Sequence, residues 1–348
     1  MKKVDYFIIG QGLAGTMLAF EMLEHNVSFK ILTSVEKSKA SNVAAGMVNP
    51  LVFKRLTKSW MVDELLPVMK TKYTRLENLL GLKFYFEKDI LKPLSAQEML
   101  LWSERKTQPE FSKYISKVEI TSPVANIRNT AGYGFVTGSG YLDTKLFLDT
   151  AEKFFRKQNL IVDSVVSPEK INLKKENFEI AGFHSRKIVF CEGYHIISNP
   201  IFQFVQLKPV KGEVLSIYAP NLSEKFTLNK KVFVLPIGDH RFKVGSTYDW
   251  NDITEQTTQQ GKASIIERLD NLIDTEYSIE NHWAGIRPTM ADRRPVLGFH
   301  PENKNIAVFN GLGTKGVMLA PYFASVMLNV LTVPRYKLIP EISIERFY

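Results

Sequence analysis

Residues 4–15 decide the fold, and they read Val4-Asp5-Tyr6-Phe7-Ile8-Ile9-Gly10-Gln11-Gly12-Leu13-Ala14-Gly15. The run 4–9 is short and apolar, with β-branched and aromatic members, which predicts a buried strand. A glycine cluster ends this run, and residues 16–24 then have helical spacing and good helix formers. Residues 28–33 predict a second buried strand. Strand, turn, helix and strand within about 30 residues indicate the βαβ unit of a parallel sheet.

The glycines in this stretch form a complete G-x-G-x-x-G motif between the strand and the helix. In such a motif Gly10 permits the tight turn, Gly12 lets the backbone approach a pyrophosphate, and Gly15 lets the helix pack on the sheet. The N-terminus of the helix offers free N–H groups and a positive dipole end to the anion. The motif in this context predicts dinucleotide binding.

One feature departs from the dinucleotide pattern. An acidic residue usually ends the second strand and binds the ribose hydroxyls, but Thr33 and Ser34 stand at that place here. Either hydroxyl could bind the ribose in its stead, and Glu36 could reach back to it. No arginine is present there to favour a 2′-phosphate.

The composition is that of a globular protein. The chain has 348 residues, 45% hydrophobic and 23% charged, which allows about two domains and excludes a disordered chain or a collagen-like fibre. No uninterrupted apolar run approaches about 18 residues, so no transmembrane helix is predicted. The one cysteine, Cys191, excludes an internal disulfide and favours a cytoplasmic location. The net charge of +9 is spread along the chain, which favours a solvated surface over a nucleic-acid or membrane interface.

The rest of the chain predicts further βα units at both ends and an antiparallel block between them. The fold class expected is α/β (α+β overall), with a discontinuous Rossmann-like domain over 1–75, 125–205 and 282–348 and an antiparallel-sheet substrate domain over 76–124 and 206–281. The predicted helices span 60–80, 96–105, 141–157, 261–272 and 317–331. The predicted strands span 83–91, 160–166, 188–190, 213–218, 232–236, 242–246 and 306–309.

Four further segments join the first motif in a family resemblance. They are Ser41 to Met47, Tyr141 to Asp143, Pro209 to Leu215, and a C-terminal block from Trp283-Ala284-Gly285-Ile286-Arg287-Pro288 to Asn310-Gly311-Leu312-Gly313-Thr314-Lys315-Gly316-Val317. Together these motifs resemble the FAD-dependent D-amino acid oxidase superfamily, in particular its glycine oxidase/sarcosine oxidase-like branch.

The resemblance implies an FAD-dependent enzyme with non-covalently bound FAD. The adenosine end would lie near the N-terminal glycines and Val166, and the glycines around 311–316 would approach the isoalloxazine. The dipole of the helix from Val317 would face the flavin edge on which negative charge accumulates. The cofactor-binding residues implied are Gly10, Gly12, Leu13, Ala14, Gly15, Thr33, Ser34, Ser41, Ala44, Ala45, Gly46, Met47, Val166, Gly193, Arg287, Gly311, Gly313, Thr314, Lys315, Gly316 and Val317.

Three residues are the candidates for the catalytic pocket. The resemblance places Arg287 at the substrate carboxylate, for which a guanidinium fork is suited; the alternative is an arginine in a structural ion pair. Phe233 stands where the branch has a tyrosine, and Thr314 stands where it has a second arginine. Glycine is therefore doubtful as the substrate, and a larger or secondary amine is allowed. Asp292 is expected to fix its loop rather than to react.

Three functions stay open at this stage. The favoured one is oxidation of the C–N bond of an amino acid or small amine, with oxygen or another carrier as the electron acceptor. A second is flavin-dependent modification of a tRNA wobble uridine, which the basic charge would suit but its diffuse distribution does not. A third is flavin binding without turnover. The basic and aromatic segment 49–60 could line the pocket entrance, or it could be a solvated loop. No metal site is predicted.

Overall fold

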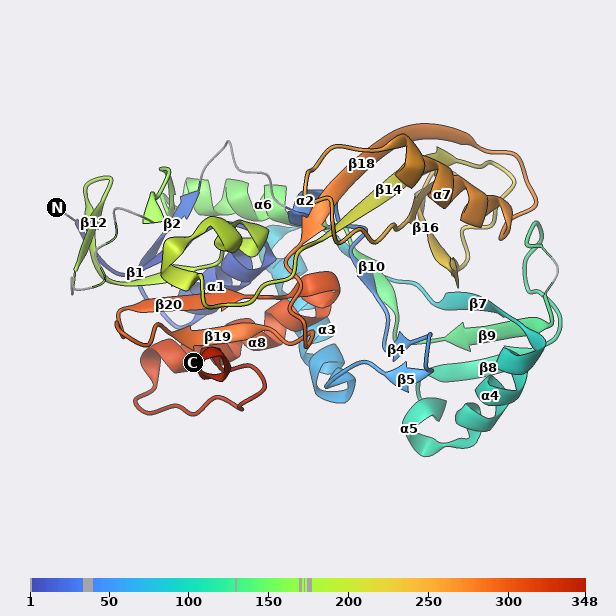
Figure 1. The fold of residues 1–348 in the computed structure, drawn as a ribbon, viewed down its shortest axis with the longest axis horizontal. Coiled ribbons are helices and arrows are strands. Elements are labelled where there is room, and N and C mark those ends of the chain that lie inside the picture. The colour runs from blue at the N-terminus through green and yellow to red at the C-terminus, as the bar shows by residue number, and fades with distance from the viewer. Residues whose placement is uncertain (1, 34–39, 129, 169–170, 172, 174–176) are drawn as a thin grey trace.

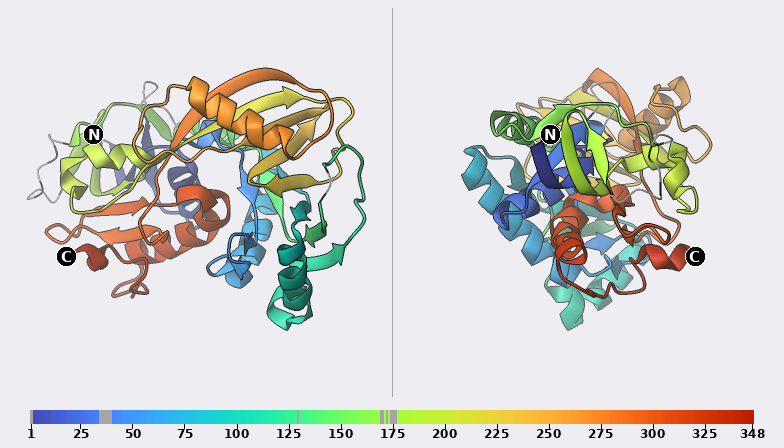
Figure 2. Two further views of the ribbon diagram at one scale, coloured as in Figure 1. Left: turned by 45° about the vertical axis from the view of Figure 1, so that its right-hand side comes forward. Right: turned by 90° about the vertical axis from the view of Figure 1, so that its left-hand side faces the viewer.

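The computed structural model describes residues 2–33, 40–128, 130–168, 171, 173 and 177–348. It has two lobes, each built around one large sheet (Figure 1). Both chain ends lie in the first lobe, and the long strands β14 (Val210–Tyr218) and β18 (Ser278–Arg287) extend from it into the second lobe (Figures 1 and 2).

The sheet of the first lobe follows the order β11-β2-β1-β13-β20-β19, and β12 pairs with β13. Its strands are β1 (Lys2–Ile9), β2 (Phe29–Thr33), β11 (Ile161–Asp163), β12 (Phe178–Ile180), β13 (Phe183–Phe190), β19 (Val296–Phe299) and β20 (Ile306–Asn310). The five strands from β11 to β20 pair in parallel, whereas β12 and β19 pair antiparallel to their neighbours. The βαβ unit predicted from the N-terminal motif is confirmed.

The side chains of β1 alternate between the two faces of this sheet, and each face is covered by other elements. Tyr6 and Ile8 join one core cluster with the helices α1 (Leu13–Glu24), α3 (Val62–Leu80), α6 (Thr144–Lys157) and α8 (Gly316–Thr332). Phe7 and Ile9 point to the other face, where they pack with the short 3-10 helices Gly193–Ser198 and Pro200–Phe202. Because both faces are covered, the sheet is buried over the second half of β1, the end of β13 and all of β20.

The helix α8 is the most apolar of the helices packed on this sheet. By length and composition alone, the segment Gly313–Thr332 is long and apolar enough to cross a membrane. In the structure, however, 61% of that window is buried, and α8 packs against α1 and α3. We therefore interpret α8 as a core helix, and no other described helix meets the same test.

The sheet of the second lobe follows the order β18-β14-β17-β16-β15-β7-β9-β8. Its other strands are β7 (Ile90–Leu94), β8 (Ile115–Glu119), β9 (Gly132–Val136), β15 (Thr227–Lys230), β16 (Val232–Gly238) and β17 (Arg241–Gly245). All neighbours pair antiparallel except β15 and β7, which are parallel. Helix α7 (Gln259–Asp270) packs on one face, and α4 (Ala96–Thr107) and α5 (Pro109–Ser112) lie beside β8.

Small elements connect the two large sheets. A three-stranded sheet has the order β3-β10-β6, and β4 pairs with β5. These strands are β3 (Met47–Val48), β4 (Leu51–Val52), β5 (Thr57–Lys58), β6 (Tyr85–Glu87) and β10 (Gly140–Leu142), and the one-turn helix α2 (Ala40–Val43) precedes them.

Several predicted elements differ from the structure. The strand predicted over 83–91 is two strands in different sheets, β6 and β7, because residues 88–89 turn the chain between them. The helix predicted from residue 141 begins at Thr144, capped by the Asp143 side chain, and Tyr141 lies in β10. Within the predicted helix 60–80, Pro67 lies inside α3, which runs through it.

The expected domain boundaries cross the observed sheets. The boundary at 124/125 lies between β8 and β9, which pair in one sheet, and the boundary at 281/282 lies within β18. The strands β8, β9 and β18 therefore share a sheet that the expected boundaries divide.

Candidate functional site

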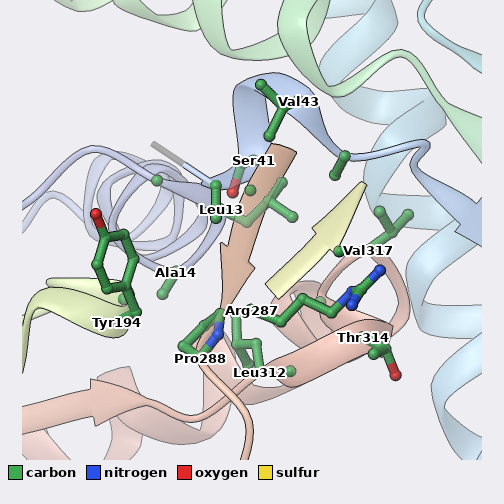
Figure 3. A pocket seen from close by; sticks show the side chains of 18 of the residues that line it. Leu13, Ala14, Ser41, Val43, Tyr194, Arg287, Pro288, Leu312, Thr314 and Val317 are labelled. Carbon is green, nitrogen blue, oxygen red and sulfur yellow. The ribbon is translucent and has the colours of Figure 1, made fainter. Parts of the chain in front are cut away.

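A cavity of about 430 Å³ lies between the lobes, at the carboxyl ends of β1, β2, β13 and β20. This edge of a parallel sheet is where ligands of doubly wound folds bind. The opposite wall is the inner face of the second sheet. Figure 3 shows Arg287 extending toward Thr314 and Val317, with Ala14 and Tyr194 on the other side. The predicted site residues that line the cavity are Gly10, Gly12, Leu13, Ala14, Thr33, Ser41, Ala44, Ala45, Gly46, Met47, Val166, Gly193, Phe233, Arg287, Gly313, Thr314, Gly316 and Val317.

The first glycine turn has the geometry that the motif predicts. Gly10 has φ +100°, and a Cβ there would lie 2.6 Å from the carbonyl oxygen of Cys191. A Cβ on Gly15 would lie 2.0 Å from the carbonyl oxygen of Gly10. Gly15 therefore packs the helix against the turn, and it does not line the cavity. A Cβ on Gly12 would meet only the Ser41 hydroxyl at 3.8 Å, so the backbone at Gly12 is open to a ligand.

The N-terminus of α1 is a free donor site. Its N-cap, Gly12, supplies no side-chain hydrogen bond, and the first turn contains no acidic residue. The first N–H groups of a helix have no partner within the helix, and together with the helix dipole they attract an anion. Since Gly12, Leu13 and Ala14 line the cavity, this end fits the pyrophosphate of a dinucleotide.

The end of β2 forms the neighbouring part of the cavity. Thr33 is buried and lines the wall with Ser164 and Val166. Its carbonyl oxygen accepts a hydrogen bond from the Ser164 amide at 3.1 Å, so the two segments predicted to hold the adenosine half lie side by side. Ser34 and Glu36, the other candidates for the ribose, lie outside the described residues.

The loop Ser41–Met47 is held against the second sheet. Trp283 Nε1 donates to the Val43 carbonyl at 2.8 Å. A Cβ on Gly285 would lie 2.4 Å from the Val43 side chain, so the two chains meet closely. Gly46 has φ +71° and approaches the Leu142 carbonyl so closely that a Cβ would lie 1.9 Å from it. These contacts place the loop along the cavity.

The second glycine cluster is also placed as expected, with two exceptions. Gly313, Thr314, Gly316 and Val317 line the cavity at the start of α8. Gly311 does not; its φ is +75°, and a Cβ there would lie 2.7 Å from Met290, so its role is to let the turn form.

Lys315 is the other exception, because its side chain leaves the cavity wall. Its Nζ donates to the Asn49 carbonyl at 3.1 Å and to Ser59 Oγ at 2.6 Å. Burial lowers the pKa of Lys315 to about 8, with a smaller contribution from Arg293. Lys315 therefore joins the start of α8 to the segment 49–59, which follows the loop Ser41–Met47, and Lys315 is not among the residues that line the cavity.

The guanidinium of Arg287 lies flat between a glycine and an aromatic ring. A Cβ on Gly212 would lie 2.0 Å from Nη2 and 2.3 Å from Cζ, so one face of the guanidinium rests on the Gly212 backbone. The ring of Tyr248 covers the other face, with its centroid 4.6 Å from Cζ, a cation–π contact. A ligand can therefore approach only in the guanidinium plane.

The hydrogen bonds of Arg287 leave one edge of that plane free. Nη1 donates to the carbonyl oxygens of Lys211 and Thr247, both at 3.3 Å, and Nη2 donates to Ser246 Oγ at 2.7 Å. Of the five N–H donors of a guanidinium, Nε–H and the second Nη2–H have no hydrogen-bond partner among the described residues. No described carboxylate pairs with Arg287, which argues against a structural ion pair. Burial lowers the pKa of Arg287 from its usual value, and Tyr248 opposes the shift, but arginine stays charged in proteins.

Phe233 and Thr314 lie on the cavity wall with Arg287. Phe233 on β16 is half-buried and packs beside Gly245, whose Cβ would lie 3.2 Å from the ring. Thr314 is exposed at the start of α8. The pocket around Arg287 is therefore apolar on one side and carries no second arginine.

Several lining residues were not among the sequence predictions. They are Glu192, Tyr194 and His195 after β13, Asn310 at the end of β20, Asn229 and Lys231 at the β15–β16 hairpin, and Tyr248 after β17. Asn310 is buried and ties the two strand ends together, since its Nδ2 donates to the Gly193 carbonyl at 2.9 Å. The signal that could have found Glu192 and Asn310 is their place directly after buried parallel strands. The residues from the second sheet have no such signal.

Other predicted features lie outside the cavity wall. The segment 49–60 does not line it; Trp60 instead stacks on Phe323 of α8, with ring centroids 5.6 Å apart. Asp292 accepts a hydrogen bond from the Arg294 amide and pairs with Arg346 at 3.2 Å, which is the loop-fixing role expected of it. Among the described residues, no three potential ligands from His, Cys, Asp and Glu are placed to hold a metal.

Cys191 is buried at the boundary between the core and the cavity. It belongs to the main core cluster, although its backbone also borders the cavity beside Gly10. Burial, with a smaller effect of Glu192, raises the pKa of the thiol well above its usual range. The structure therefore keeps the thiol protonated.

Comparisons with known proteins agree with this geometry. A family model described as FAD dependent oxidoreductase matches residues 5–329. The chain is 24% identical to a glycine oxidase of Bacillus licheniformis over 95% of the chain and 93% of the relative. It is 23% identical to a tRNA 5-methylaminomethyl-2-thiouridine biosynthesis bifunctional protein of Legionella pneumophila, over 84% of the chain but 45% of that relative. A solved glycine oxidase structure from Geobacillus kaustophilus has a TM-score of 0.82 at 18% identity and covers 98% of each chain.

Proposed function

The chain belongs to the FAD-dependent oxidoreductase family, and from this premise we propose that it oxidises the C–N bond of an amino acid or related small amine that has a carboxylate. Because this family depends on FAD, the cofactor is FAD. The relatives named glycine oxidase support the substrate class.

The described residues fit FAD in the cavity between the lobes. The open backbone at Gly12 and the uncapped start of α1 would hold the pyrophosphate. Thr33 and Val166 would border the adenosine half, and the start of α8 at Val317 would border the flavin. Bound FAD would supply the hydride acceptor for the carbon that bears the amine, and these residues would bind the cofactor and orient the substrate. We propose non-covalent FAD, since burial keeps the only cysteine protonated and packed in the core.

The observation that supports a carboxylated substrate is the free edge of Arg287. The guanidinium is fixed by three hydrogen bonds and by the contacts with Gly212 and Tyr248. Its Nε–H and one Nη2–H have no partner among the described residues, and two such donors in one guanidinium plane can bind the two oxygens of a carboxylate. A carboxylate bound to Arg287 at this edge would orient the amine-bearing carbon toward the flavin end of the cavity.

The other pocket residues limit the choice of substrate. Phe233 supplies an apolar surface without a hydroxyl. Because residue 314 is a threonine, Arg287 is the one arginine among the described lining residues that can bind the carboxylate. A ligand as small as glycine would leave the Phe233 surface uncovered. We therefore propose a larger or secondary amine. We also propose a cytoplasmic protein with no nucleic-acid or membrane partner, which the single free cysteine and the diffuse charge support.

The test is reduction of the purified yellow protein by a panel of amino acids and secondary amines without oxygen. We expect bleaching of the flavin absorbance by a subset of carboxylated amines, and a much weaker response of the Arg287→Ala variant to the same compounds. Failure of every amine to reduce the flavin would refute C–N oxidation and favour flavin binding without turnover. Salt-sensitive retention of tRNA, with no response to free amines, would instead favour the tRNA-modifying function.

A further inference from the structure

We infer that the substrate has a second anionic group, and that Lys231 and Asn229 at the β15–β16 hairpin bind it. This inference rests on the proposed function and deepens it, because it names the class of substrate. The ligand would be an acidic amino acid, or an amine with a second carboxyl group on its nitrogen substituent.

The hairpin places both side chains at the cavity. Asn229 pairs directly with Phe233 across the two strands, so both point to the same face of the sheet, and both line the cavity. Lys231 is the single residue between β15 and β16, with φ +59°, and it also lines the cavity. A connection this short holds the Lys231 backbone at the rim.

The sheet register brings the hairpin level with the Arg287 guanidinium. Gly245 pairs with Phe233 on one side and with Val214 on the other. Because β16 and β14 both run antiparallel to β17, a step of two residues toward the N-terminus along each strand leads from Phe233 to Lys231 and from Val214 to Gly212. Lys231 is therefore level with Gly212, on which the guanidinium rests. Two strand spacings separate them, which is about 10 Å.

This separation is between backbone positions, and the long, exposed Lys231 side chain can span part of it. One small molecule with two acid groups can therefore place one carboxylate against the guanidinium and the other against the ammonium, each at hydrogen-bond distance. The ligand series described below measures the spacing between the two acid groups.

The charges of the cavity favour an anion at this position. Among the described lining residues the only carboxylate is Glu192, which lies at the far end after β13 and accepts a hydrogen bond from Asn199 Nδ2 at 2.7 Å. The side chains of Asn229 and Lys231 have no hydrogen bond or ion pair with a described residue. A cation and an amide donor therefore line the pocket without a described protein group that neutralises them.

The test compares Lys231→Gln with Lys230→Gln. Lys230 lies in the same hairpin but does not line the cavity, so its variant matches the change in net charge. Ligand dissociation constants are measured by calorimetry on the FAD-loaded protein with two- to five-carbon dicarboxylates and monocarboxylates of equal length. The kcat/KM values are measured for acidic amino acids against their amides, and for N-carboxymethyl amines against N-ethyl amines.

We expect the parent protein to prefer the dianionic member of at least one pair. Lys231→Gln should reduce that preference about two- to fivefold, the range for a solvent-exposed ion pair, and leave the affinity for the monoanionic ligands unchanged. Lys231→Arg should keep the preference, Lys230→Gln should not affect it, and 0.5 M salt should weaken it through screening. A preference within the amino-acid pair would place the second acid on the amino-acid side chain. A preference within the N-carboxymethyl pair would place it on the nitrogen substituent.

Absence of any dianion preference in the parent protein, or an equal loss in Lys230→Gln, would overturn the inference. These outcomes are distinct from failure of the proposed function. If no amine reduces the flavin while dicarboxylates still bind through Lys231, C–N oxidation is wrong and the anion site stands. If amines reduce the flavin with no acid preference, the function stands and the anion site is wrong.

Discussion

Substituting Gly212 by alanine would displace the substrate-binding arginine without removing it. The new Cβ would lie 2.0 Å from Nη2 and 2.4 Å from Nη1 of Arg287, whereas ordinary van der Waals contact begins near about 3.4 Å. The guanidinium must therefore move by about 1.4 Å. This shift exceeds the tolerance of its hydrogen bonds to Ser246 and to the Lys211 and Thr247 carbonyls, and it turns the free edge away from the position of the ligand.

The expected loss follows from the interactions that the arginine makes. A hydrogen bond to a charged group contributes about 1.5–3 kcal/mol, so loss of the aligned pair should weaken carboxylate binding about 10- to 150-fold. The fold should tolerate the change, because the clash is with the end of a flexible side chain. FAD content should stay unchanged, since Gly212 lies away from the glycine turn that would hold the pyrophosphate.

The assay is carboxylate binding to the FAD-loaded protein, measured by flavin absorbance and by kcat/KM for any oxidised amine. The double variant with Arg287→Ala is the control. If Gly212 acts only through the guanidinium, adding Gly212→Ala to Arg287→Ala should have almost no further effect. Wild-type affinity of Gly212→Ala, or an equal loss in the Arg287→Ala background, would refute the reasoning.

Three more outcomes follow from the contacts and pKa shifts. Gly15→Ala should lower the melting temperature and the FAD content together, because its Cβ would meet the rigid Gly10 carbonyl at 2.0 Å; normal FAD retention would contradict the tight turn. The pKa of Lys315 is about 8 in the folded state and lies below its value in the unfolded state, so the folded state releases this proton first. The unfolding free energy of the wild type should therefore increase by up to about 3 kcal/mol as the pH rises from 8 to 10.5. Lys315→Met should lack that gain in denaturant titrations at the two pH values, and parallel pH profiles would disprove it. Cys191 should resist a thiol reagent in the native protein and react after denaturation, whereas rapid native labelling would show an accessible thiolate.

Much of the first lobe could be predicted because its signals are local. The run Val4–Ile9, the glycines at 10, 12 and 15 and the helix after them are consecutive, and their steric requirements follow from backbone geometry alone. The same holds for Gly313 and Gly316 at the start of α8. Both clusters line or shape one cavity, as expected.

The second lobe was harder to predict because its pairings are between distant segments. The strands β8, β9 and β15 are short, and they are recognisable only through their partners in the sheet. The parallel pairing of β15 with β7 joins segments more than 100 residues apart. The division of residues 83–91 between two sheets depends on pairing with β10 and β9, which lie tens of residues along the chain, and no local pattern records either pairing.

The sequence by itself determined the dinucleotide-binding unit, the residues at its turns and the candidate arginine, since these depend on glycine sterics and on motifs of adjacent residues. Only the tertiary structure decided what surrounds that arginine. Gly212, Tyr248 and Lys231 come from separate strands and loops, and they meet Arg287 or its cavity because the second sheet folds over the first lobe. The motif predicts Lys315 near the flavin, but its side chain turns to Asn49 and Ser59, because a neighbouring segment that is distant in sequence offers its ammonium two oxygen acceptors.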